Sequence, residues 1–361
     1  MNLFKLGDDL SPTTKIILVI SGVGLIFLLW IFLTYGETPI MSSGILPPPW
    51  RVFTAFGDMY RDNELIRNTC LSLGMNLSGY LEAILLSIPL GFLIGLWPVA
   101  RSMFQRPVDA LRYVPLTAVI GLFIGLFGIG IPMKVHFLAF GILIYLLPVV
   151  VQRLDEVDDV YLKTVYTLGA NAWQTIRTVY FPAVISRLSD DIRVLTAISW
   201  TYIIFAEMMG SEGGIGAMIW RVGQRQGRFD KIWALLVLIM IIGIVQDKLF
   251  TIADRHLFPH KYQQAESATK GKMKAESLWA VIWTYLRKSL FWTLIGAYLL
   301  LFINEFTGMI SSVRIFHYLF DRTAIAVHLI MWVIIVVKGL EFYREWAADR
   351  RKSNVQASQT T

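Results

Sequence analysis

Residues 161–193 read YLKTVYTLGANAWQTIRTVYFPAVISRLSDDIR, and this stretch decides how the rest of the chain is arranged. It is the longest interior segment that cannot lie in lipid, because charged side chains recur along it between strongly apolar flanks. These charged residues are Lys163, Arg177, Arg187, Asp190, Asp191 and Arg193. Gly169 precedes Pro182 by thirteen residues. Glycine permits a sharp break between two short helices, and proline opens or bends the helix that follows it.

Between this glycine and this proline the apolar residues recur at helical spacing. They are Ala170, Trp173, Ile176 and Val179, which predicts an amphipathic helix of about three turns. A polar helical hairpin on a membrane surface needs a surface to dock against. We therefore expect residues 161–193, called the polar hairpin below, to bind a separate protein. The alternative is an ordinary loop in which the glycine and the proline coincide by chance.

The composition places the chain among polytopic membrane proteins. Of its 361 residues, 55% are hydrophobic and 16% are charged, and the mean hydropathy is +0.57. Soluble domains carry about 25% charged residues. The net charge of +7 could suit nucleic-acid binding, but the Lys and Arg residues lie mostly in alternate loops, as the positive-inside rule expects. We therefore expect membrane lipid around the chain and no nucleic-acid partner.

The sequence offers no set of residues for catalysis or for a metal. The single cysteine, Cys70, excludes an intramolecular disulfide and a cysteine metal cluster. His317 and His328 are too differently placed to suggest a metal site, and no nucleophile, base and acid occur together. The first apolar run is too long for a signal peptide and lacks a small-residue cleavage site, so we expect it to remain as an anchor.

Apolar runs of about 20 residues predict the spanning helices. Six core spans are expected at residues 16–35, 71–97, two within 115–151, 194–209 and 232–250, followed by two C-terminal spans at 290–304 and 324–337. If both chain ends and the polar hairpin lie in the cytoplasm, roughly twice as many Lys and Arg residues lie inside as outside. The opposite orientation would expose the hairpin to the exterior and break the positive-inside rule.

The expected organisation follows from these spans. The expected parts are 1–66 (first span and external amphipathic segment), 67–257 (core), 258–289 (charged linker), 290–340 (two extra spans) and 341–361 (cytoplasmic tail). We expect an internal loop around Arg101, Arg106 and Arg112, a solvated linker from Lys261 to Ser277, and disorder near the end of the tail. Residues 72–80 are small and polar enough to lie against protein rather than lipid.

The polar hairpin resembles the EAA loop of ABC importer permeases, whose pattern is Glu-Ala-Ala, three residues, Gly, nine residues and Ile-x-Leu-Pro. The Gly169-to-Pro182 spacing fits this pattern, with Val179 and Phe181 in place of Ile and Leu. Lys163-Thr164-Val165 stands where Glu-Ala-Ala would be. The acidic contact usual in that family is therefore replaced, which implies an adapted partner surface.

A second stretch, WTYIIFAEMMGSEGGIG at residues 200–216, follows the hairpin. It resembles the nitrate, sulfonate and taurine type of importer permease, in which a Trp, then Ala-Glu, then a Gly-x-Gly turn follow the EAA loop. Two motifs in the correct order are more specific than either one alone. The resemblance covers roughly residues 15 to 257.

Several charged and glycine residues admit two interpretations. Glu207 either shapes the translocation path or outer gate, or is a helix-terminal carboxylate paired with a neighbour. The glycines at 213, 214 and 216 follow no strand and precede no Gly-Lys-Ser/Thr, so they predict a tight turn rather than a nucleotide site. The arginines at 221, 225 and 228 form a stripe that either attracts an anion or an acidic binding-protein rim, or is simply solvated.

These resemblances imply the membrane subunit of an ABC importer, not an enzyme. The expected fold is an all-α polytopic transmembrane bundle, with six core spans of the type I importer kind plus two C-terminal spans. The residues expected to couple to the ATPase are Lys163, Leu168, Gly169, Ala170, Trp173, Ile176, Val179, Phe181 and Pro182. Those expected along the translocation path or gate are Trp200, Glu207, Gly210, Gly214 and Gly216.

The resemblance also implies partners. These are a cytoplasmic ABC ATPase that binds the ATP, an extracytoplasmic solute-binding protein, and a second permease copy or a paired permease. The bacterial inner membrane is the expected location, no cofactor is expected in this chain, and the expected solute is a small anion such as nitrate, a sulfonate or bicarbonate. Two alternatives stay open. One is a secondary transporter or channel, which predicts inverted repeats and charged broken helices; the other is a scaffold or regulatory subunit that has lost transport.

Overall fold

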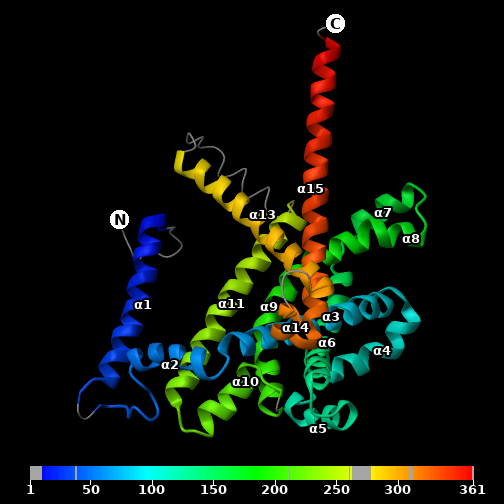
Figure 1. Ribbon diagram of the computed structural model, residues 1–361. Coiled ribbons are helices and arrows are strands. Elements are labelled where there is room, and N and C mark those ends of the chain that lie inside the picture. The colour runs from blue at the N-terminus through cyan, green and yellow to red at the C-terminus, as the bar shows by residue number, and fades with distance from the viewer. Residues whose placement is uncertain are drawn as a thin grey trace. The chain divides into compact units, whose positions relative to one another are not determined.

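The computed structural model describes residues 10–36, 39–210, 212–259, 261, 278–308 and 312–359, and every regular element within these ranges is helical (Figure 1). Six of the described helices are long and apolar enough to cross a membrane, or seven if a bent pair counts as one span. This confirms the predicted all-α polytopic fold.

The helices follow one another along the chain with short connections. They are α1 (Pro12–Thr34), α2 (Pro49–Asp62), α3 (Leu65–Leu96), α4 (Pro98–Leu111), α5 (Leu116–Phe127), α6 (Ile131–Asp155), α7 (Asp159–Thr167), α8 (Ala172–Thr175), the π-helix η1 (Ile176–Tyr180), α9 (Phe181–Met208), α10 (Ile215–Met218), the π-helix η2 (Ile219–Gln224), α11 (Phe229–Leu257), α13 (Leu278–Thr307), α14 (Ile315–Phe320), the 3-10 helix η3 (Asp321–Thr323) and α15 (Ala324–Gln359).

The chain divides into two compact units, residues 1–65 with 217–241 and residues 66–216 with 242–361. In the first unit, the indole of Trp30 packs on that of Trp233 with ring centroids 6.0 Å apart, and its nitrogen donates to the carbonyl of Pro47 at 3.0 Å. The predicted amphipathic segment is α2, whose Trp50 and Phe53 are exposed while Val52, Ala55 and Met59 are buried.

The second unit is built around α3, α6 and α9. Helix α3 approaches α6 closely because it carries glycine where the two helices meet. A Cβ at Gly79 would lie 2.8 Å from the carbonyl oxygen of Val135, and one at Gly91 would lie 2.4 Å from the side chain of Val150. Small residues at such positions let membrane helices pack backbone against backbone. Buried Asn76 of α3 donates to Ser199 of α9 at 2.9 Å, so the segment 72–80 lies against protein, as predicted.

Helices α6 and α9 run antiparallel and pack along one another. Buried Phe137 and Ile144 of α6 share a cluster with Ala206 of α9 and with Leu116 and Ile120 of α5. Helix α6 has 25 residues, which corresponds to about 37 Å. The polar hairpin leaves one end of this pair, and the loop after α9 lies at the other end (Figure 1).

Four predictions of local structure were wrong. The expected loop around Arg101 is the helix α4, which begins at Pro98, a favoured first helical position. Helix α5 has only 12 residues, too few to span a bilayer alone, and it is bent by 106° from α4. The chain stays helical as far as Gln359, because residues 341–359 contain no Gly or Pro and are rich in helix-forming residues. The fourth, on Lys261, is described with the site, and residues 262–277 of the predicted linker lie outside the described ranges.

Substitution of Gly79 by Ala tests the α3–α6 contact. The added Cβ would press on the carbonyl of Val135 and on Leu138, and such overpacking costs about 1–3 kcal/mol. We expect a lower melting temperature for the purified protein in detergent. Gly243→Ala in α11, where a Cβ meets nothing within 4 Å, is the control and should leave stability unchanged or raise it. Equal behaviour of the two variants would contradict the close contact.

Candidate functional site

The turn of the polar hairpin is formed by a glycine in a left-handed conformation. Helix α7 ends at Thr167, and Gly169 has φ of +77°, a conformation that a residue with a Cβ rarely adopts. The amide of Gly169 donates to the carbonyl of Tyr166 and that of Ala170 to the carbonyl of Val165, both at 3.0 Å. These bonds satisfy carbonyls at the end of α7. The predicted break at Gly169 is therefore confirmed.

The return strand of the hairpin begins with a capping box. The side chain of Asn171 accepts from the amide of Gln174, and the side chain of Gln174 accepts from the amide of Asn171, both at 2.8 Å. Sequence reasoning missed both residues, although Asn-x-x-Gln before a helix is a recognisable start signal. The two bonds fix the geometry of the tip without any partner protein.

The tip of the hairpin presents apolar side chains to its surroundings. Leu168 is 80% exposed, Trp173 is 69% exposed and Tyr166 is 56% exposed. Lys163 is exposed as well. Exposed aromatic and aliphatic residues gathered in one place are typical of a protein-binding surface. We call Tyr166, Leu168 and Trp173 the tip patch.

The other predicted hairpin residues lie elsewhere on the segment. Ala170, Ile176 and Val179 are half-buried, so the expected apolar stripe faces partly inward. Phe181 is half exposed, and its ring centroid lies 6.1 Å from that of Phe92 on α3.

Pro182 does not start a separate helix. The chain is helical without a break from Ala172 to Met208, and the π-helix η1 lies immediately before the proline. The amide of Phe181 bonds to the carbonyl of Ile176, five residues back. A proline has no amide hydrogen, and its ring clashes with the carbonyl four residues earlier, which the wider π turn accommodates. Motion of the hairpin is thereby carried directly into α9.

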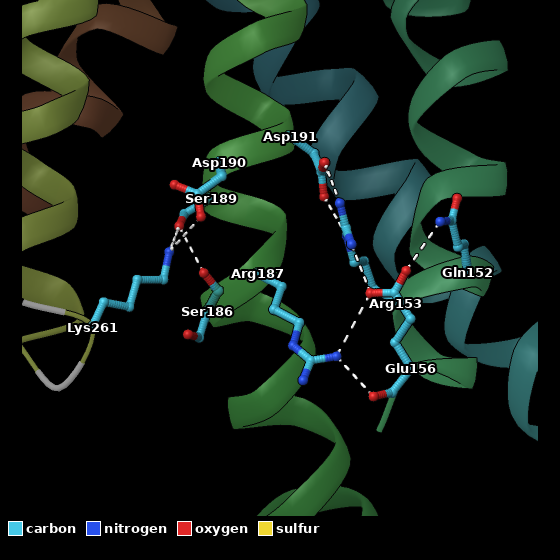
Figure 2. A network of polar contacts seen from close by, with 9 residues as sticks. All are labelled: Gln152, Arg153, Glu156, Ser186, Arg187, Ser189, Asp190, Asp191 and Lys261. Carbon is cyan, nitrogen blue, oxygen red and sulfur yellow. Dashed lines mark hydrogen bonds and ion pairs between the residues drawn. The ribbon is translucent and has the colours of Figure 1, made fainter. Parts of the chain in front are cut away.

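The base of the hairpin is held by a network of ion pairs (Figure 2). Arg153, in the last turn of α6, makes a bidentate contact with Asp191 of α9, with N–O distances of 2.7 and 2.8 Å. The same guanidinium donates to Glu156 at 2.6 Å. Planar, paired contacts of this kind are stronger and more directional than a single hydrogen bond. The pair ties the two helices together at the point where the hairpin leaves them.

Arg187 and Glu156 add a second tie at the same place. The guanidinium of Arg187 donates to the backbone carbonyl of Glu156 at 2.8 Å, where α6 ends. A cation at a helix C-terminus is also favoured by the helix dipole. The hydrogen bond from Arg153 lowers the pKa of the Glu156 carboxyl, so this carboxylate stays ionised at neutral pH.

Lys261 joins the network from the end of α11 (Figure 2). Its ammonium lies 3.2 Å from Asp190 and 3.3 Å from Asp254, and it donates to Ser189 at 2.6 Å. Lys261 was predicted to begin a solvated linker, and this was wrong because two acidic side chains meet it. Neither the sequence distance to Asp190 nor its direction could be read from composition.

A cavity of about 420 Å³ lies beside this base, between α4 and α6. Its polar lining includes Gln105, Arg112, Gln152 and Asp155, and the rest of the lining is mostly apolar. Asp155 is paired with Arg101 of α4. The volume is within the range of small-molecule pockets.

The residues predicted for the path or gate meet at the opposite end of α6 and α9. Glu207 is completely buried, and its carboxylate accepts from the amide of Gly216 at 2.7 Å. A Cβ at Gly214, where φ is +104°, would lie 2.4 Å from this carboxylate. A Cβ at Gly210 would lie 2.6 Å from Lys134. We call residues 213–216 the glycine loop; it closes over Glu207.

Three residues of this site were missed by the sequence reasoning. Lys134 of α6 is fully buried and reaches the carbonyl of Gly213 at 3.4 Å. Asn68 and Ser72 of α3 accept from the amides of Gly214 and Ile215, both at 2.8 Å. A single lysine in an apolar run is a usable signal, whereas nothing in the sequence marks Asn68 or Ser72. Trp200 lies apart from them and donates to Gln246 of α11 at 2.9 Å.

Neither end of the molecule offers a metal centre. Within the part of the chain that the structure describes, no three His, Cys, Asp or Glu side chains are grouped to hold a metal ion. His328 packs among aromatic rings instead, and lies 3.1 Å from the hydroxyl of Tyr298.

Known proteins resemble the chain over this same region. The family described as "Binding-protein-dependent transport system inner membrane component" matches residues 87–259. A probable ABC transporter permease protein of Brucella melitensis biotype 1 is 28% identical over 242 residues, 66% of this chain and 97% of that protein. The taurine transport system permease protein TauC of Escherichia coli (strain K12) is 27% identical over 243 residues, 64% of this chain and 86% of TauC. A solved structure of the MetNI methionine ABC transporter in inward-facing conformations aligns with a TM-score of 0.48 at 19% identity, over 53% of this chain and 94% of that chain.

Replacement of Asp191 by Asn tests the hairpin base. The amide cannot form the charged bidentate pair with Arg153, and loss of hydrogen bonds to a charged group costs about 1.5–3 kcal/mol. We expect faster amide hydrogen exchange in residues 159–180. Asp109→Asn is the control, because its pair with Arg112 lies within one helix and is exposed; its effect should stay within about 0.5 kcal/mol. Unchanged exchange in Asp191→Asn would show that the network does not hold the hairpin.

Proposed function

Since the chain belongs to the ABC importer permeases, through the inner-membrane transport component at residues 87–259, we propose that its polar hairpin is the part that an ATPase subunit grips. The chain is a transport subunit rather than an enzyme. In this proposal it moves a small anion into the cytoplasm, and ATP is bound and hydrolysed only by the partner.

The tip patch is the observation that carries this proposal. Leu168 and Trp173 stand exposed on a turn that is already fixed by Gly169 and by the Asn171–Gln174 capping box. A rigid tip loses little conformational entropy on binding. Tryptophan is also enriched among the residues that dominate protein-binding energy. We assign the tip patch as the contact with the ATPase, with Lys163 beside it as the altered part of the motif.

The ion pairs at the base give the mechanical route in this proposal. When the ATPase moves the hairpin, Arg153–Asp191 obliges α6 and α9 to move with it, and the unbroken helix from Ala172 carries the motion along α9. That helix ends at Glu207, beneath the glycine loop. The proposed consequence is that displacement at the hairpin opens or closes the loop at the far end.

The remaining partners follow from this direction of transport. We place the hairpin and both chain ends in the cytoplasm of a bacterial cell and the glycine loop at the outer face of the inner membrane. A solute-binding protein would deliver the solute there, and the permease would act as a pair of identical or similar subunits, since one bundle forms half of a pathway. Arg221 and Arg225 are exposed and suit an anion or an acidic protein rim, whereas Arg228 is paired with Asp230. Similarity to the taurine permease supports a sulfonate among the candidate anions.

Trp173→Glu tests the docking. A charge on the tip patch should weaken binding of the ATPase subunit by about 30-fold or more, equivalent to about 2 kcal/mol, because the indole would fill an apolar contact. Binding is measured by co-purification and by titration of the labelled ATPase. Trp50→Glu on α2, a comparably exposed tryptophan outside the hairpin, is the control and should bind normally. Normal binding by Trp173→Glu would overturn the assignment.

Uptake into proteoliposomes tests the transport activity and the gate. The permease with its ATPase and binding protein should take up taurine, nitrate or bicarbonate only when ATP is present. Gly214→Val should abolish uptake yet keep ATPase binding, because its side chain would collide with Glu207 and strain a backbone of positive φ. Uptake driven by an ion gradient without the ATPase would instead support a secondary transporter. No uptake with any of these anions would remove the substrate proposal.

A further inference from the structure

The two C-terminal helices form a small structure of their own. Glu305, near the end of α13, accepts from the amides of Phe316 and His317 at 3.1 and 3.0 Å and so caps α14. Tyr298 of α13 and His328 of α15 lie 3.1 Å apart and share a cluster of aromatic rings with Phe302. These contacts fix how α13, α14 and α15 are joined.

A tight turn in this structure presents a threonine to the core. Asp321 has φ of +49°, unusual for a residue with a side chain, and its carboxylate accepts from the amide of Arg322. Thr323 follows and is 3% exposed. Its hydroxyl donates to the carbonyl of Phe320. The turn therefore holds both Phe320 and Thr323 in fixed positions.

Thr323 and Phe320 meet the core at Gly74 of α3. A Cβ at Gly74 would lie 2.1 Å from the hydroxyl oxygen of Thr323 and 3.0 Å from the ring of Phe320. Two helical turns earlier, Arg67 donates to the carbonyl of Tyr318 at 3.3 Å and lies over its ring at 5.2 Å. Positions 67 and 74 lie on one face of α3, so α14 and η3 cover that face.

The same stretch of α3 also holds the glycine loop. Asn68 and Ser72 lie between Arg67 and Gly74, and they bind the amides of Gly214 and Ile215. The next amide, that of Gly216, is bound by Glu207. The C-terminal structure and the glycine loop therefore touch opposite sides of about two turns of one helix.

We propose that the C-terminal extension braces α3 and thereby positions the glycine loop over Glu207. Through Thr323 and Tyr318 it fixes the place of Asn68 and Ser72, on which the loop hangs. Gly74 and Thr323 act as positioning residues, since neither touches the loop itself. The inference rests on the proposed role of this loop as the outer gate, and it gives the extension a part in controlling that gate.

A size exchange at the contact tests the brace. Gly74→Ala places a methyl group against Thr323, and Thr323→Ala in the same chain removes the nearest atom. In Gly74→Ala we expect the amides of residues 214 and 215 to exchange about tenfold faster, as their hydrogen bonds open more easily. The double variant should return most of the protection. Gly296→Ala in α13, where a Cβ meets nothing within 4 Å, is the matched control and should exchange normally.

Exchange in residues 137–147 of α6 serves as an internal reference. It should stay unchanged in Gly74→Ala, and an equal rise there would reduce the contact to general stability and overturn the proposal. Unchanged exchange at residues 214 and 215 would overturn it as well. In uptake assays, Gly74→Ala should raise the binding-protein concentration needed for half-maximal rate more than it lowers the maximal rate. If the wild-type chain shows no ATP-driven uptake, the proposed function fails while the exchange result still decides whether the brace exists.

Discussion

The antiparallel pairing of α6 and α9 is the constraint on which the second unit depends. At one end the pair is fixed by the bidentate contact of Arg153 with Asp191. At the other end buried Lys134 of α6 and Glu207 of α9 meet the same glycine loop. Charged groups are costly in a membrane protein's interior unless they are paired or hydrogen-bonded. Polar contacts at both ends, with apolar packing between them, make the two helices move as one body.

This constraint explains why the hairpin has the structure that it has. A lever must not bend at its base or at its tip. Gly169 and the Asn171–Gln174 capping box fix the tip, and the arginine pairs together with Lys261 fix the base. The π-helix before Pro182 removes what would otherwise be a hinge. Flexibility is thus excluded from the hairpin, and the apolar tip patch is left as the surface on which a partner can act.

The glycine loop shows the opposite design. Its backbone amides are held individually, by Asn68, Ser72 and Glu207, rather than by a helix or a sheet. A segment held by a few side-chain hydrogen bonds can open without disturbing the core. Helix α3 is therefore the element whose position matters most for the loop. It packs closely on α6 through Gly79 and Gly91 and on the C-terminal extension through Gly74.

The sequence by itself determined the membrane class, the α-helical fold, the break at Gly169 and the family, because long apolar runs and fixed glycine–proline spacing are local features of the chain. It also identified Glu207 and the glycines that surround it. Only the tertiary structure decided which residues meet. Lys134, Asn68 and Ser72 reach the loop from other helices, and Lys261 reaches Asp190 across 71 residues. The length of α5 and the course of the chain past Pro182 were also set by packing and by hydrogen-bond geometry. A contact between distant segments depends on how helices pack in three dimensions, and no local pattern records it.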